Sequence, residues 1–108
     1  MADTLHSEQG VLGTGSTAIL DAVAASTSET VIGLALSNIS GTSADVTVDL
    51  SITKQGGSLR KILNDVSLPF GTTITIDTKF VLATGDTMQG LASAASSVDF
   101  NVSYLKQV

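Results

Sequence analysis

Several residue types that many functional sites require are missing or scarce in this sequence. The 108 residues include no cysteine and no tryptophan, one proline and one histidine. Without cysteine, the chain can form neither disulfide bonds nor thiolate metal sites. A Ser–His–acid triad would have to use His6, which stands in a polar terminal segment where no rigid geometry is expected to hold it. The sequence therefore predicts no redox chemistry, no zinc site and no serine-hydrolase site.

Positive charge is also scarce. Five Lys and Arg residues stand against ten Asp and Glu residues, so the formal net charge is −5. The basic residues are scattered, and only Arg60 and Lys61 are adjacent. A negative chain without a basic patch is repelled by nucleic acid phosphates and by anionic lipid surfaces. We therefore expect neither nucleic acid nor a membrane as a partner.

Long hydrophobic runs are missing as well, and we expect no signal peptide in the first residues. The longest apolar run, "VIGLAL" at 31–36, is far too short to span a bilayer. The first ten residues, "MADTLHSEQG", lack the apolar core of a signal peptide. Charged residues make up only 14% of the chain, while small and β-branched residues are abundant. This composition favours a β protein whose surface is partly covered by copies or partners.

Short segments of alternating apolar and polar residues are what the sequence does contain. In "ADVTVDLSI" at 44–52, Val46, Val48, Leu50 and Ile52 alternate with polar residues. Such alternation predicts a β-strand with one buried face and one solvated face. The solvated face would carry a row of four polar side chains: Asp45, Thr47, Asp49 and Ser51. The segment "SSVDFNVSYL" at 96–105 alternates in the same way and directs four side chains inward: Val98, Phe100, Val102 and Tyr104.

A third segment is apolar on both faces. In "TVIGLALSN" at 30–38, we expect Ile32, Leu34 and Leu36 to share one face, with small apolar residues opposite. A strand of this kind is expected to be central in its sheet or covered on both faces. In the weaker strand "TMQGLAS" at 87–93, Gly90 predicts a bulge or a close approach of another backbone.

Turn signals separate these segments: "SGTSA" at 40–44, "KQGG" at 54–57, "PFG" at 69–71 and "ATGD" at 83–86. They divide the chain into about seven or eight strands, spaced roughly ten residues apart. We therefore predict an all-β fold over residues 16–108, a single antiparallel β-sandwich of jelly-roll or immunoglobulin-like type. Residues 1–15 are expected to form an extended N-terminal arm, either disordered or ordered by a neighbour.

Three further motifs resemble functional sites. The segment "GTGSTA" at 13–18 resembles a dinucleotide loop but lacks the strand before it and the helix after it, so we interpret it as part of the arm. Asp45 and Asp49 have neither calcium-loop nor glycosidase spacing, and we interpret them as solubility features. Phe70, after Pro69, is the one aromatic expected to be exposed, and a single aromatic makes a poor sugar platform. We predict no catalytic, cofactor-binding or metal-binding residues.

Four segments, in order, resemble a family of small virion structural proteins of tailed bacteriophages, especially phages of marine and cyanobacterial hosts. "TVIGLALSNISGTSADVTVDLSI" is similar to the family's "xLxLxN" strand, small-residue turn and "VxVxL" strand. "ILNDVSLPFGTTITI" resembles "LvkdvpIPxGssl", and "KFVLATGDTM" resembles "kivLexGDsi". "ASSVDFNVSYLKQV" is similar to the terminal "ssvDvxvSYLEi". The sequence departs from the pattern at Phe70 and at Lys106–Gln107.

The resemblance implies a non-enzymatic β-sandwich subunit of the virion, assembled in the cytoplasm of the bacterial host. It implies a capsid decoration (cement) protein, or alternatively a neck, tail or baseplate protein. The implied partners are copies of the chain itself, as a trimer or ring, and other virion proteins such as the major capsid or tail proteins. Ordering an arm costs about 1–2 kcal/mol per residue, so the arm must gain contacts elsewhere. The residues expected to make subunit contacts are Val11, Leu12, Ile19, Leu20 and Phe70.

Three other interpretations remain open. A receptor- or carbohydrate-binding module predicts an exposed aromatic pocket. A small enzyme predicts a clustered acid–base pair, and the sequence does not reveal one. A secreted adhesion or pilus-like domain predicts an export signal.

Overall fold

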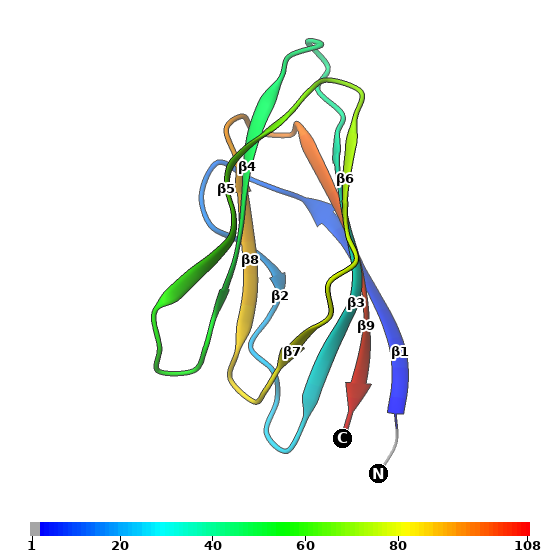
Figure 1. Ribbon diagram of the computed structural model, residues 1–108, viewed down its shortest axis with the longest axis vertical. Coiled ribbons are helices and arrows are strands. Elements are labelled where there is room, and N and C mark those ends of the chain that lie inside the picture. Colours follow the sequence, from blue (N-terminus) through cyan, green and yellow to red (C-terminus); the bar gives the residue numbers. More distant parts are fainter. Residues whose placement is uncertain (1–2) are drawn as a thin grey trace.

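The computed structural model describes residues 3–108, which form nine antiparallel strands in two facing sheets (Figure 1). The predicted all-β antiparallel sandwich is therefore confirmed. No helix within this range is long and apolar enough to cross a membrane. The strands are β1 (Asp3–Val11), β2 (Thr17–Leu20), β3 (Ser28–Asn38), β4 (Val46–Thr53), β5 (Leu59–Leu68), β6 (Thr73–Ile76), β7 (Phe80–Leu82), β8 (Thr87–Ala92) and β9 (Val98–Gln107).

The strand order explains which segments meet. The first sheet has the order β1-β9-β3-β6, with β7 also paired to β3, and the second has the order β2-β8-β4-β5. The predicted central position of the strand at 30–38 is confirmed, since β3 pairs with β9 on one side and with β6 and β7 on the other. The strand β1 lies at the edge of the first sheet, beside β9 (Figure 1).

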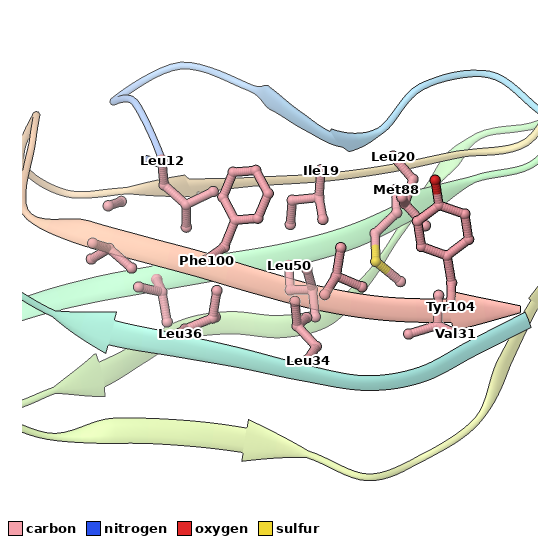
Figure 2. Close-up of a cluster of buried hydrophobic side chains, with 14 of the residues drawn as sticks. Leu12, Ile19, Leu20, Val31, Leu34, Leu36, Leu50, Met88, Phe100 and Tyr104 are labelled. Atoms are coloured by element: carbon pink, nitrogen blue, oxygen red, sulfur yellow. The ribbon is translucent and has the colours of Figure 1, made fainter. Parts of the chain in front are cut away.

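The core lies between the sheets and takes side chains from both of them. Phe100 and Tyr104 are each only 7% exposed, as the alternation in the last strand predicts. Figure 2 shows both rings among aliphatic side chains from the facing sheet. Burying one such side chain contributes about 1.5–3 kcal/mol. The largest fully buried side chains are Leu12, Leu36, Leu50, Leu68, Leu82, Met88, Val31, Val48, Val98 and Val102.

The register of β3 corrects the face predicted for Ile32. The pairing of β3 with β9 shifts between Val31 and Gly33, which indicates a bulge. Val31 is 1% exposed, whereas Ile32 is 37% exposed and lies on the other face. The inward-facing set is therefore Val31, Leu34 and Leu36, because the extra residue resets the alternation for the first part of the strand.

The solvated face predicted for β4 is only half correct. Asp45 is exposed, but Asp49 and Ser51 are 7% and 4% exposed. The neighbouring strand β5 is irregular, with two register shifts against β4 and a positive φ of 49° at Asp65. This irregularity directs groups of β5 onto Asp49, so the carboxylate is covered although it stands on the outward-facing side of the alternation.

The N-terminal segment differs from the extended arm expected over residues 1–15. Asp3–Val11 pairs with β9 along its whole length, and Leu12 is fully buried. Residues 1 and 2 of the expected arm lie outside the described residues. A polar segment can form an edge strand because the ladder consists of backbone hydrogen bonds, which side-chain hydropathy does not reveal.

Glycines account for two further predictions. At the predicted turn in "KQGG", Gly56 has a φ of +71°, which closes the β4–β5 hairpin at little steric cost. At Gly90 in β8, an added Cβ would lie 2.9 Å from the carbonyl oxygen of Asp49 and 3.3 Å from side-chain atoms of Leu12 and Ile19. The predicted close approach at Gly90 is confirmed.

Candidate functional site

Asp86 is the most enclosed acidic side chain near a turn, and its oxygens all have partners within the chain. The residue is 3% exposed, and it accepts hydrogen bonds from the backbone N–H groups of Ala83 and Gln55, each at 2.9 Å. Lys54 Nζ completes the set at 2.8 Å. Burial alone would raise the pKa of Asp86, but the hydrogen bonds from Lys54, Gln55 and Ala83 hold it below its usual value. Asp86 therefore joins two turns and is not available as an acid or base.

Asp49 has a similar structural role on the second sheet. Its carboxylate accepts a hydrogen bond from Lys61 Nζ at 2.7 Å and one from the backbone N–H of Asp65 at 2.6 Å. The hydrogen bond from Lys61, followed by that from Asp65, holds the pKa of Asp49 below its usual value. Both donors belong to β5, so Asp49 fastens this irregular edge strand onto β4.

A polar seam lies where β1 and β2 close one side of the sandwich. It contains a depression of about 220 Å³ whose lining includes Glu8, Asp21, Glu29 and Tyr104. Glu29 is 8% exposed, and burial raises its pKa, while the positive charge of Lys106 opposes the shift. A carboxyl group with a raised pKa in a depression is a candidate acid or base.

The surroundings of this seam offer little chemistry. The ring of His6 stacks on Tyr104 with centroids 5.4 Å apart, and its Nε2 lies 2.8 Å from the hydroxyl oxygen of Thr4. Burial, together with the charge of Glu29, raises the pKa of Tyr104. Within residues 3–108, no group of three or more His, Asp, Glu or Cys side chains is arranged to hold a metal ion. We therefore interpret the seam as a polar contact between β1 and the rest of the sandwich.

The outward-facing side of the first sheet is a different kind of surface, and we call it the outer face. The strand registers align Leu5, Leu105, Thr30 and Val81 in one row across β1, β9, β3 and β7. Leu5 is 75% exposed and Val81 is 60% exposed. Apolar side chains gathered on a surface in this way are typical of interaction sites.

The rest of the outer face is small and almost uncharged. A broad depression of about 610 Å³ lies on it, and the lining includes Val11, Ala35, Ser37, Ile39 and Asp99. Within β1, β3 and β9, the alternation places two charged side chains on this face, Asp3 and Asp99. A flat face of small residues allows a second surface to approach closely, and it has few charges to desolvate.

The structure divides the five predicted contact residues into two groups. Val11 and Phe70 are 47% and 46% exposed, so both offer surface to a neighbour. The other three lie in the core of their own chain (Figure 2), with exposed fractions of 0%, 4% and 3% for Leu12, Ile19 and Leu20. In this fold these three side chains stabilise the subunit and leave no surface for a neighbouring subunit to contact.

Sequence reasoning did not identify the apolar row on the outer face. Leu5 stands alone among polar residues, and Val81 lies in a strand of only three residues. The register brings Leu5 and Val81 into one row, although they are far apart in the sequence. The one available signal was the odd–even position of Leu5 and Leu105 in two segments that could pair.

No model of a known protein family matches the chain, and neither does any curated protein. Solved structures do match. One belongs to the Bacillus endospore appendages, a family of disulfide-linked pili, with a TM-score of 0.54 and 13% identity over 99% of this chain and 87% of that chain. Another is the acid-stable capsid of Helicobacter pylori bacteriophage KHP30, with a TM-score of 0.53 and 11% identity over 100% of this chain and 89% of that chain.

A third match is a chain of the infectious bursal disease virus Gx strain. The TM-score is 0.54 and the identity is 17%, over 96% of this chain but only 29% of the viral chain. The present chain therefore spans less than a third of that protein. At identities this low, the three matches indicate a shared β-sandwich fold.

Proposed function

We propose that this chain is a non-enzymatic structural subunit of a tailed-phage virion, placed on the capsid exterior as a decoration (cement) protein. In this role it binds copies of itself and the major capsid protein, and it is assembled in the bacterial host cytoplasm. One observation carries the proposal: the most enclosed carboxylates are used inside the fold, whereas apolar side chains lie exposed on the outer face. This arrangement suits binding to other protein surfaces.

Two further findings support the proposal. The matched solved structures come from disulfide-linked pili, a phage capsid and a virus. The sequence also resembles small virion structural proteins of tailed phages over its four segments. Both findings favour a repeated structural subunit over an isolated enzyme.

The proposal is tested on purified virions whose genome encodes this sequence. We expect mass spectrometry of the washed particles to find the chain in many copies, and cryo-electron microscopy to place it on the capsid exterior. A position on the neck or tail would overturn the decoration role and leave the structural role standing. Absence of the chain from the particle would overturn both.

A receptor- or glycan-binding module is the second candidate, and one observation favours it. Phe70 is 46% exposed in the turn between β5 and β6, and its backbone N–H is fixed by a hydrogen bond of 2.9 Å to Asp45. An exposed aromatic ring on a turn whose backbone is anchored can stack on a sugar. Glycan-array binding that is lost in Phe70→Ala would favour this function, whereas an array without any signal would exclude it.

A further inference from the structure

The edges of the two sheets differ in how they are protected against pairing with other strands. Unprotected edge strands present free backbone N–H and C=O groups, and proteins usually shorten, bulge or charge such edges. Within residues 3–108, β2 and β6 have four residues each and β7 has three. The ten-residue β5 has two register shifts and carries Arg60 and Lys61.

The edge strand β1 is neither short nor bulged, and its charged side chains, Asp3 and Glu8, are both acidic. It has nine residues, it contains no Pro, Lys or Arg, and its register with β9 is unbroken from Asp3 to Val11. A long and regular edge of this kind is a template for the addition of another strand.

The pairing with β9 determines which backbone groups of β1 face outward. The N–H of Leu12 donates to the carbonyl oxygen of Val98 at 2.9 Å, so the even-numbered residues point their backbone groups toward β9. The odd-numbered residues therefore present free N–H and C=O groups at the edge of the sheet. These residues are Asp3, Leu5, Ser7, Gln9 and Val11.

The sequence of β1 is self-complementary around its midpoint. An antiparallel copy with its two-fold axis at Ser7 would place Leu5 opposite Gln9 and pair all nine residues, with every outward-facing backbone group matched. On the other side of the ladder, the same register would place His6 of each copy opposite Glu8 of the other. An imidazole beside a carboxylate is a favourable cross-strand pair.

The neighbouring registers are less favourable. An axis at Glu8 would place two like charges directly opposite each other, which destabilises a strand pair. An axis at His6 would place two imidazoles together and leave the end of β1 unpaired. Charge and length therefore select the same register.

We propose that β1 pairs with β1 of a second copy about a two-fold axis at Ser7. The pairing joins the two first sheets into one continuous sheet, and both outer faces lie on the same side of it. This inference rests on the self-association that forms part of the proposed function. It adds that the copies meet at the edge strand β1 and are related by a two-fold axis.

The first test measures the dissociation constant of the full chain by sedimentation velocity over a range of concentrations. We expect a concentration-dependent dimer. Ser7→Pro removes an outward-facing donor at the axis but no donor to β9, and we expect it to weaken the dimer at least tenfold. Thr75→Pro, a matched change in the opposite edge strand β6, should leave the dimer within threefold of wild type. Circular dichroism verifies that both variants are folded.

A charge exchange tests the register separately. His6→Glu would place a carboxylate opposite Glu8 of the other copy on each side of the axis. We expect this repulsion to weaken the dimer at least tenfold. The double variant His6→Glu/Glu8→Lys would place a carboxylate opposite an ammonium group instead, and we expect its dissociation constant to return to within threefold of wild type. Both variants lose the stacking of His6 on Tyr104, so a dimer recovered in the double variant shows that the single variant lost it through charge.

Hydrogen exchange locates the contact. We expect the amides of Leu5, Ser7 and Gln9 to gain protection as the protein concentration rises, because they point outward in the monomer. A wild-type chain that stays monomeric at millimolar concentration overturns the inference, and virion mapping still tests the proposed function. A dimer that is insensitive to Ser7→Pro and His6→Glu also overturns the pairing of β1 with β1, but it supports the self-association in the proposed function.

Discussion

The two long edge strands, β1 and β5, present most of their side chains to solvent, but they are attached to their sheets in different ways. The strand β1 follows β9 in an unbroken register and depends mainly on backbone pairing. The strand β5 is interrupted by two register shifts and fastened through Lys61 and the backbone of Asp65 to the buried Asp49. A bulged, basic edge resists pairing with other strands, whereas a regular edge without basic residues permits it. The comparison indicates that one edge is closed to partners and the other is open.

The largest effect is expected at Asp49, which fastens β5. Asp49→Ala leaves the N–H of Asp65 and the ammonium group of Lys61 without their acceptor. The side chain of Lys61 is 43% exposed and can regain water, so we expect a loss of about 2–3 kcal/mol in unfolding free energy, below the full cost of breaking a buried ion pair. Urea denaturation measures the loss.

Asp45→Ala, a change of the same kind immediately before β4, provides the control. Asp45 is exposed and accepts one hydrogen bond, from Phe70, so its removal should cost less than about 1 kcal/mol. Equal losses in the two variants would show that Asp49 does not fasten β5.

The next effect concerns the attachment of β1. A Cβ added at Gly10 would lie 2.7 Å from two ring atoms of Phe100, so the ring must move within the core. We expect Gly10→Ala to lower the unfolding free energy by about 1–2 kcal/mol. At Gly15 a Cβ would meet nothing within 4 Å, so Gly15→Ala is the matched control. If both substitutions had the same effect, close packing of β1 on Phe100 would be excluded.

Much of the fold could be predicted from the sequence because alternation and turn residues report burial directly. Phe100 and Tyr104 fall on the buried face that the alternation requires, and Gly56 lies in the hairpin turn predicted for it. The pairing of β1 was missed because its side chains contribute little to the core, and the ladder that holds it consists of backbone groups. A pattern of side chains contains little information about such a strand.

The candidate surface was harder to predict for a related reason. Four of the five predicted contacts were chosen as apolar residues in or near the expected arm, but three of them, Leu12, Ile19 and Leu20, fill the core once β1 and β2 are in place. The row formed by Leu5 and Val81 depends on the order of strands in the first sheet. The coverage of Asp49 likewise depends on the bulge in β5, which arises from tertiary contacts.

The pH dependence of stability should separate the two sides of the molecule. The lowered pKa values of Asp49 and Asp86 mean that their contributions are fully present above the unfolded-state value of about 3.9 and are lost as the pH falls through the folded-state values. Glu29, in the seam under β1, has a raised pKa, so its contribution is present at low pH and lost as the pH rises through the folded-state value.

Glu29→Gln tests this assignment. The substitution removes a buried ionised group at neutral pH, so we expect a higher melting temperature than wild type at pH 7 and a smaller difference at pH 4. Melting curves recorded by circular dichroism from pH 3 to pH 8 measure both. A variant that is less stable than wild type at pH 7 would show that the charge of Glu29 is favourable there, through Lys106.

The smallest effect is expected at Asp65, where the bulge of β5 uses a φ of 49°. Glycine adopts this conformation without strain, but it also gives the unfolded chain more freedom, so the two changes oppose each other. Because the backbone N–H that donates to Asp49 remains, Asp65→Gly should change the unfolding free energy by less than about 1 kcal/mol. Asp65→Val, with a β-branched side chain at positive φ, should destabilise more. Urea denaturation measures both variants. If it ranked them in the opposite order, the bulge would not depend on the backbone conformation at Asp65. The protection of this edge would then have to come from Arg60 and Lys61 alone.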